Sequence, residues 1–202
     1  MTKRVGFDRP SLIIERKNML YLILWAAIAA VIVIADQVTK FIVVQNIPEG
    51  ESIPFIEGVL HWTHIKNDGA IFGWFDDSRW MFMILSAVGI VVMSGMLVYW
   101  VKKEPKDKIM QVILTLLIAG GIGNMIDRCT IGVVTDFIDF CAFPNLWKWI
   151  FNVADCAVTI GGCMMFVWLI WSIIVEIKNK KNANNAPVQA QESDHADSDA
   201  QG

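Results

Sequence analysis

The sequence predicts an all-α polytopic membrane protein with four transmembrane helices, a small extracytoplasmic β-rich segment and an interfacial segment. Of the 202 residues, 55% are hydrophobic and only 18% are charged. The apolar residues form long uncharged stretches, and a helix of about 20 such residues crosses a bilayer. Four stretches of this kind are present, and the remaining chain is too short to bury them inside a soluble domain.

The four predicted spans cover about residues 19–44, 80–101, 109–128 and 151–175, within one membrane domain of residues 19–175. The first span begins like a signal peptide, with basic residues before an apolar run. Its apolar run continues beyond Ala30 to Val44, which favours an uncleaved helix. Tryptophans stand at or near the span ends, as interfacial anchors do: Trp80, Trp100, Trp147, Trp149 and Trp171.

The distribution of lysine and arginine predicts that both termini are cytoplasmic, because positive residues stay on that side of a membrane. Residues 1–18, the inner loop 102–108 and the start of the tail 176–202 are basic, whereas the outer segments 45–79 and 129–150 carry few positive residues. The tail is rich in Asn, Gln, Ala, Asp and Ser and is predicted to be disordered. We therefore expect a bacterial inner-membrane protein whose polar site faces outward.

The outer segments carry two local signals. β-favouring residues flank Asn-Asp-Gly at 67–69, which predicts a strand pair with a turn there. Residues 137–149 mix aromatic residues with few charges, which predicts a segment lying at the membrane interface.

No metal, cofactor or nucleic-acid partner is expected. His61 and His64 are three apart in a predicted strand, so they tend to point to opposite faces. The four cysteines lack CxxC spacing, which leaves only a pairing of Cys129 with Cys141 as an open question. No basic arm interleaves with aromatic residues, as nucleic-acid binding would require.

Ionisable and amide side chains collect at the outer ends of three predicted helices. Within each helix they are spaced i,i+3 or i,i+4 and so share a face. Ionisable residues at such positions are expected to be functional. They are Asp36 and Lys40 in the first span, Asn124, Asp127 and Arg128 in the third, Asn152 and Asp155 in the fourth, and Asp136 just outside the third.

Simpler roles remain open for several of these residues. Asp36 and Lys40 form an ion pair at a helix end as readily as a site. Arg128 is placed to extend its guanidinium to the interface, and Asn152 suits a helix N-cap. The glycines of GGIG and TIGG favour close helix packing over phosphate binding, because no strand precedes them.

Asp136 and Asp155 are the two polar residues for which a purely structural role is hardest to find. Two carboxylates at one low-dielectric site share a proton, because they cannot both ionise easily. The ionised member can then take a proton from water while the protonated member polarises a carbonyl. No G-x-S-x-G motif is present to indicate a serine nucleophile. The pair therefore predicts an aspartic peptidase.

Five motifs resemble those of the lipoprotein signal peptidase (signal peptidase II) family, in order and spacing, over residues 19–175. They are ADQVTKF (35–41), NDGAIFG (67–73), GGIGNMIDR (120–128), VVTDFIDF (133–140) and FNVADCAVTIG (151–161).

The resemblance implies an aspartic endopeptidase that removes signal peptides from diacylglyceryl-modified bacterial prolipoproteins, cutting before the lipidated cysteine. It implies that Asp136 and Asp155 are catalytic, that membrane lipids surround the site and that globomycin-type inhibitors bind. It further implies supporting or substrate-binding roles for Asp36, Lys40, Asn67, Gly123, Asn124, Arg128, Asn152 and Ala154.

Two alternatives compete with a peptidase. A proton-coupled transporter or relay also uses Asp pairs, but it needs polar residues across the membrane or an inverted repeat, and neither is visible. A purely structural protein would tolerate Asn at position 136 or 155.

Overall fold

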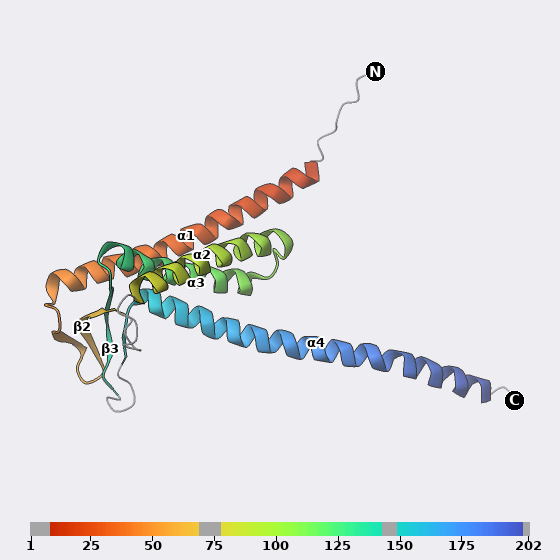
Figure 1. Ribbon diagram of the computed structural model, residues 1–202. Helices are drawn as coiled ribbons and strands as arrows, with labels where there is room; N and C mark the ends of the chain where they lie inside the picture. Colours follow the sequence, from red (N-terminus) through yellow and green to blue (C-terminus); the bar gives the residue numbers. More distant parts are fainter. Residues whose placement is uncertain (1–8, 69–77, 143–148, 200–202) are drawn as a thin grey trace, which may run out of the picture. The chain divides into compact units, whose positions relative to one another are not determined.

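The computed structural model describes residues 9–68, 78–142 and 149–199 (Figure 1). The chain divides into two units, Met1–Gly162 and Cys163–Gly202. The helices are α1 (Arg9–Asn46), α2 (Ser78–Lys103), α3 (Lys108–Thr130) and α4 (Val153–Asp199), and the strands are β1 (Ser52–Ile56), β2 (Leu60–Asn67), β3 (Val134–Phe140) and β4 (Ile150–Phe151). Within the described residues, four helices are long and apolar enough to cross a membrane. The predicted fold class, mostly helical with a small antiparallel sheet, is confirmed.

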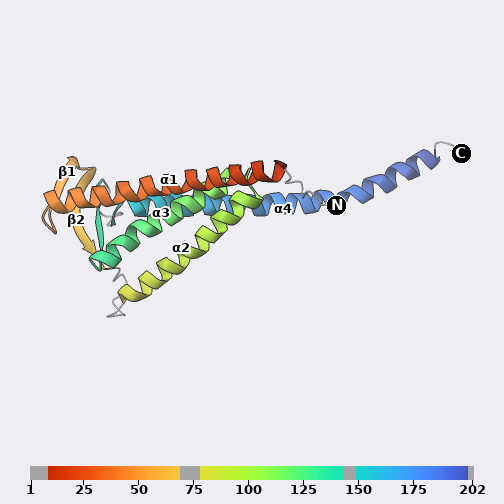
Figure 2. The ribbon, with the colours of Figure 1, turned by 90° about the horizontal axis from the view of Figure 1, so that it is seen from above.

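Helix α3 is the central helix of the first unit. Half of its apolar window is buried, against 6% for α1 and none for α2. Both α1 and α2 pack against it, and the three run side by side (Figure 2). The helix begins where the Asp107 side chain accepts a hydrogen bond from the Met110 backbone N–H at 3.1 Å, the usual satisfaction of an N-terminal donor. It ends before Gly132, whose φ of +86° suits a residue without a side chain.

Much of the surface of α1 and α2 consists of exposed large apolar side chains. Val31, Leu85 and Val91 are 66%, 66% and 70% exposed. A water-facing surface of this kind would be unfavourable, whereas a lipid-facing one is expected for a membrane-spanning helix.

Two glycines of α3 set how closely the helices approach. A Cβ atom at Gly123 would lie 2.8 Å from Asp36 Oδ2 of α1 and 2.9 Å from the Ala154 Cβ of α4. A Cβ atom at Gly120 would collide with the Ala154 carbonyl and with Val158. Small residues of this kind let helix backbones meet, which is the packing role expected for GGIG.

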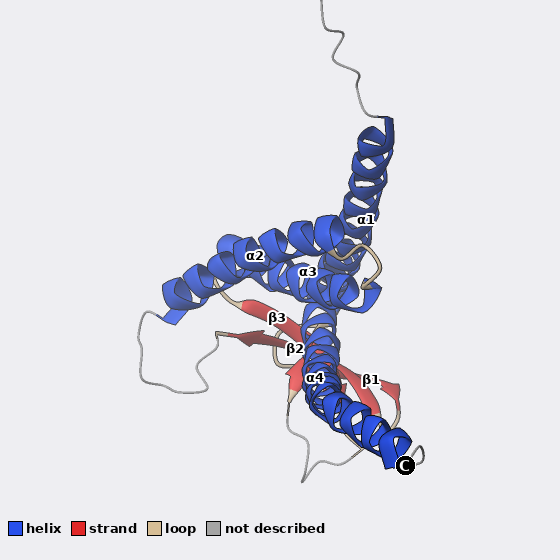
Figure 3. Ribbon diagram, turned by 90° about the vertical axis from the view of Figure 1, so that its right-hand side faces the viewer, coloured by secondary structure: helices blue, strands red, loops and turns tan. Residues whose placement is uncertain are grey.

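The four strands form one antiparallel sheet in the order β1-β2-β3-β4, at the end of the helices where α1 and α3 finish (Figure 3). Phe137 of β3 is fully buried against Val43 and Ile47 at the end of α1, and its ring stacks on Trp62 at 5.3 Å. This apolar cluster attaches the sheet to α1 and so fixes the position of β3.

The outer segments contain a hairpin whose turn lies between β1 and β2 at Gly58, where φ is +69°. Asn67 ends β2 and pairs with Val134 of β3, whereas the turn predicted at 67–69 and the strand predicted after it extend into residues 69–77, outside the described part of the chain. Of the segment predicted at the interface, 137–149, residues 137–140 belong to β3 and residues 143–148 lie outside the described part of the chain. Residues 69–73 of the NDGAIFG motif, and Trp147, lie outside the described residues.

The tail also differs from the prediction of disorder, because α4 continues to Asp199. Glu176 and Lys180 form an i,i+4 ion pair of 2.7 Å beyond the apolar stretch, and Ala and Gln are good helix formers.

All four cysteines are free thiols, so Cys129 and Cys141 do not pair. His61 lies 3.3 Å from Ser52 Oγ, and His64 Nδ1 donates to the Ile47 carbonyl at 2.8 Å.

We expect Gly120→Ala to destabilise the protein by about 1–3 kcal/mol, because the added methyl group meets the backbone of α4 and cannot be accommodated by a side-chain shift. Thermal unfolding in detergent, followed by circular dichroism, measures the change. Gly95→Ala in α2 is the matched control, since nothing lies within 4 Å of its added Cβ. Equal melting temperatures for the two variants would contradict close packing at Gly120.

Candidate active site

A layer of polar side chains lies where α1 and α3 finish, where α4 begins and where the sheet starts. The centre of this layer is the ammonium group of Lys40, which is 3% exposed. Its Nζ lies 2.8 Å from Asp36 Oδ2 in α1 and 2.9 Å from Asp127 Oδ2 in α3. It also donates to Asn124 Oδ1 at 3.1 Å. One cation therefore pairs with two buried carboxylates from different helices.

The two carboxylates have further partners that tie neighbouring elements together. Asp36 Oδ1 accepts the Ala154 backbone N–H at 2.8 Å, which joins α1 to the first turn of α4. Gln37 Nε2 lies 3.1 Å from Asp36 Oδ2, from Asp127 Oδ1 and from the Gly123 carbonyl. Buried charges are tolerated only when they are paired and hydrogen-bonded, and this network meets both conditions.

Asn152 is the N-cap of α4 and also contacts both candidate catalytic acids. Its Oδ1 accepts the Asp155 N–H at 2.9 Å, and Asp155 Oδ2 in turn accepts the Asn152 N–H at 3.2 Å. This reciprocal pair is a capping box. The Asn152 amide also donates to Asp136 Oδ1 at 2.7 Å. A single fully buried asparagine thus holds Asp136 and Asp155 beside each other.

Asn124 supports the same pair from α3. Its Nδ2 donates to Asp155 Oδ1 at 2.7 Å, and its Oδ1 accepts from Asn152 at 3.1 Å and from Lys40. The amide orientation of Asn124 is therefore fixed from both sides, with its oxygen toward the cation and its nitrogen toward the carboxylate. It links the Lys40 network to the Asp136–Asp155 pair.

Strand pairing brings Asn67 to Asp136. Asn67 lies opposite Val134 in the β2–β3 register, so Asp136 is its diagonal neighbour on the same face of the sheet. The Asn67 amide donates to Asp136 Oδ2 at 2.8 Å. Each oxygen of the Asp136 carboxyl therefore accepts a hydrogen bond from an asparagine.

Asp136 is 2% exposed, and its burial raises the pKa of its carboxyl group from the ordinary value of 3.8 to about 6. The hydrogen bond from Asn67 opposes this rise, whereas the charge of Asp155 adds to it; Asn152 and Lys40 also oppose it. Asp155 is only partly buried. The two acids therefore differ in environment, and such a difference is what separates a proton-holding carboxyl from an ionised one.

Arg128 lies at the side of this network. Its guanidinium lies over the Phe82 ring of α2, 5.6 Å from the ring centroid, and Nη1 donates weakly to the Asn124 carbonyl at 3.4 Å. Within the described part of the chain it forms no ion pair shorter than 4 Å with a carboxylate. Its position beside the site, half-buried, leaves its other donors available to a ligand.

The structure thus brings together nearly all the residues singled out in the sequence, with Gly123 giving the close approach of helices and Arg128 at the side. The simpler roles for Asp36, Lys40 and Asn152 are also present: the first two are ion-paired and the third caps a helix. A structural role and a role in the site therefore coincide in these residues.

Sequence reasoning placed Asp127 in the polar cluster without assigning it a partner, and it missed Gln37 and Thr135. Asp127 pairs with Lys40 and accepts the Thr135 N–H at 3.0 Å, which fixes the start of β3. The signal for Gln37 was its place between Asp36 and Lys40 in an otherwise apolar helix, where a polar residue needs a partner. Thr135 acts through its backbone and leaves no such signal.

Two adjacent carboxyl groups with different environments can share one proton and activate a water molecule. Such an arrangement suits general acid–base catalysis by the carboxyl groups. Within the described residues, no group of three or more His, Cys, Asp and Glu side chains is placed to hold a metal ion.

Comparison with known proteins gives consistent matches over most of the chain. A family profile described as signal peptidase (SPase) II matches residues 28–171. The lipoprotein signal peptidase of Halalkalibacterium halodurans is 38% identical over 158 residues, which cover 78% of this chain and 96% of that protein. That of Brevibacillus brevis is 43% identical over 136 residues, covering 66% and 86%. A bacterial membrane enzyme solved at 1.9 Å is similar in structure, with a TM-score of 0.65 and 36% identity over 72% of this chain and 92% of the other.

We expect Lys40→Met to destabilise the protein by about 3–5 kcal/mol, because it leaves two buried carboxylates without their shared cation. The melting temperature in detergent measures the loss. Lys66→Met is the matched control: Lys66 pairs with Glu49 at 2.7 Å, but its side chain is 44% exposed, so no measurable change is expected. A similar loss in both variants would show that the burial of Lys40 is unimportant.

The raised pKa of Asp136 predicts a pH-dependent loss of stability. The unfolded carboxyl ionises near pH 3.8 and the folded one near pH 6, so the wild type loses stability relative to Asp136→Asn as the pH rises between these values. The loss should reach about 2–3 kcal/mol above pH 6. The free energy of unfolding of both proteins, measured from about pH 4 to about pH 7.5, tests this expectation. Parallel curves would mean that Asp136 has an ordinary pKa.

Proposed function

This chain belongs to the signal peptidase II family, and we propose that Asp136 and Asp155 are its catalytic aspartic dyad. The family removes signal peptides from lipoproteins, so the substrates are prolipoproteins, and the chain is a multi-pass bacterial membrane protein. The observation that supports the dyad most directly is the bridging of both carboxyl groups by Asn152 at the start of α4.

In the proposed reaction Asp155 is the base and Asp136 holds the shared proton. The assignment is supported by the deeper burial of Asp136 and its raised pKa. Asp155 takes a proton from water as the water oxygen bonds to the scissile carbonyl carbon, while Asp136 protonates the carbonyl oxygen. The C–N bond then breaks as Asp155 gives its proton to the leaving amino group of the lipidated cysteine, and a hydroxyl group of the tetrahedral intermediate returns a proton to Asp136 as the carbonyl re-forms. Asp155 is then ionised and Asp136 protonated, as at the start.

The surrounding residues have supporting roles in this proposal. Asn67 and Asn152 hold the Asp136 carboxyl in place, and Asn124 holds that of Asp155, so that little reorganisation is needed during the reaction. Asp36 and Lys40 fix the first turn of α4 through Ala154. Arg128 is placed beside the site to bind polar groups of the substrate.

We further propose that both termini are cytoplasmic and that the site opens at the outer face of the inner membrane. The end of α2, with Lys102 and Lys103, and the following loop, with Lys106, lie at the opposite end of the helices from the sheet and the polar layer (Figure 1). Positive residues favour the cytoplasmic side, which places the polar layer outside. A diacylglyceryl chain can then stay in the bilayer while the scissile bond reaches water. No cofactor or nucleic acid is required, and globomycin-type inhibitors are expected to compete at this site.

The decisive test is cleavage of a diacylglyceryl-modified prolipoprotein by the purified full-length protein in detergent. We expect Asp136→Asn and Asp155→Asn each to lower kcat by at least about 1,000-fold, because either change removes the shared-proton chemistry. Asp139→Asn is the matched control: it lies on the same strand, three residues from Asp136, but accepts a hydrogen bond from Thr63 at 2.9 Å outside the polar layer. This variant should retain wild-type activity.

Two results would overturn the proposal. Substantial cleavage by either dyad variant would remove that residue from the catalytic pair. Absence of cleavage by the folded wild type would instead favour the transporter or relay, for which proton uptake into vesicles is the corresponding assay.

A further inference from the structure

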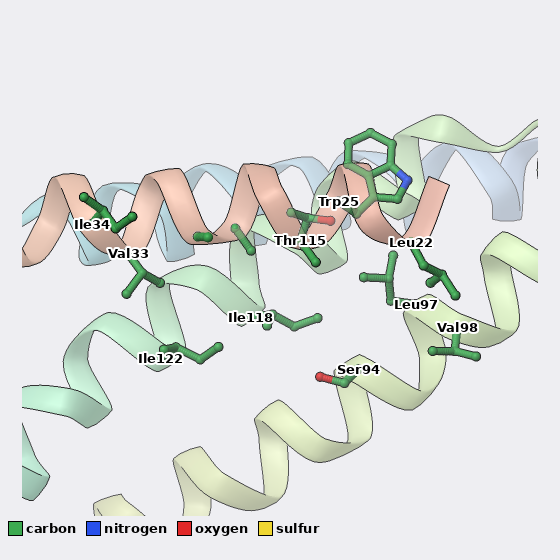
Figure 4. A pocket seen from close by; sticks show the side chains of 13 residues that line it. Leu22, Trp25, Val33, Ile34, Ser94, Leu97, Val98, Thr115, Ile118 and Ile122 are labelled. Atoms are coloured by element: carbon green, nitrogen blue, oxygen red, sulfur yellow. The ribbon is translucent and has the colours of Figure 1, made fainter. Parts of the chain in front are cut away.

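An apolar groove lies between α1, α2 and α3, away from the polar layer. It has a volume of about 470 Å³, within the range of roughly 300–1,000 Å³ of small-molecule sites. Figure 4 shows Leu22 and Val33 of α1, Leu97 of α2 and Ile118 of α3 around the same space. The groove extends along α1 from Leu22 to Ile34.

The groove presents almost only apolar groups to an occupant. Trp25 lines it, but its indole Nε1 donates to Gln111 Oε1 at 2.8 Å. Thr115 also lines it, and its hydroxyl donates to the Gln111 carbonyl at 2.7 Å. Ser94 is the remaining polar side chain among the lining residues. Because the Trp25 and Thr115 donors are already satisfied and the other lining residues are apolar, the site favours a hydrocarbon chain over a polar ligand.

The groove continues at one end into a polar recess. Leu22 lines both cavities, and the recess, of about 440 Å³, is also lined by Asn18, Lys102 and Lys103 at the end of α2. Neither lysine forms an ion pair shorter than 4 Å with a carboxylate in the described part of the chain. Glu15 lies at the rim as the one acid among the lining residues. The apolar groove thus leads to two cations, Lys102 and Lys103, at the end of α2.

We propose that this groove and recess bind an anionic phospholipid, with an acyl chain beside Trp25 and Val33 and the phosphate at Lys102 and Lys103. Basic pockets at the ends of transmembrane helices recognise lipid headgroups in this way. The other apolar candidate is the hydrophobic part of a signal peptide, which carries positive charges at its cytoplasmic end. Lys102 and Lys103 would repel that end, so the charges favour the lipid.

The test uses full-length protein in nanodiscs of phosphatidylcholine containing a trace of phosphatidylglycerol with a photoactivatable acyl chain. Adducts are mapped by mass spectrometry, and phosphatidylcholine with the same photoactivatable chain is the headgroup control. We expect phosphatidylglycerol to label 22–34, 94–98 and 115–122 preferentially. Lys102→Gln/Lys103→Gln should lower this labelling roughly tenfold. Lys178→Gln/Lys181→Gln removes the same charge from α4 and should leave it unchanged.

Ala29→Phe, which fills the groove without changing charge, should also abolish labelling there while leaving the melting temperature close to wild type. Three results would overturn the proposal. Equal labelling by both lipids would indicate ordinary boundary lipid. Labelling that persists in Lys102→Gln/Lys103→Gln would remove the headgroup site. Displacement of the lipid by a synthetic signal peptide would identify the peptide as the occupant.

Discussion

The buried ammonium group of Lys40 is the constraint on which the site depends. It lies between carboxylates of α1 and α3, and through Asp36 it also fixes the first turn of α4. A charge in this position is unfavourable without its partners, so the three helices must meet with their polar residues in one layer. Gly123 lets them approach closely enough to do so. The position of the dyad follows from this arrangement.

Asn152 connects the start of α4 to the proposed catalytic pair. The direction of its side chain is set by capping α4, and the same side chain holds the carboxyl group of Asp136. Because the cap and the dyad share one residue, fraying of the first turn of α4 would separate the two acids. The sheet contributes the second constraint, since only the β2–β3 register places Asn67 against Asp136.

The sequence was most informative where charge interrupts an apolar stretch. Asp36, Asn124 and Asp155 stand at helix ends that the spans place at one depth, so their convergence was predictable. The partner of Lys40 in α3 was not, because the rotation of one helix about another decides whether Asp127 or a neighbour faces it. The pairing of Asn67 with Val134 was not predictable either, because the β2–β3 ladder is a long-range contact that no local sequence signal encodes. The continuation of α4 beyond residue 181 was missed because composition alone does not distinguish a helical tail from a disordered one.

The separation of the site residues along the chain has a consequence for biogenesis. Asp36 is synthesised early, but its hydrogen-bond partner Ala154 and the cap Asn152 arrive only with the last helix. Both outer segments must also reach the same side of the membrane before β2 can pair with β3. In a nascent or truncated chain the proposed dyad is therefore not assembled, and on the proposed mechanism hydrolysis begins only when insertion of the whole membrane domain is complete.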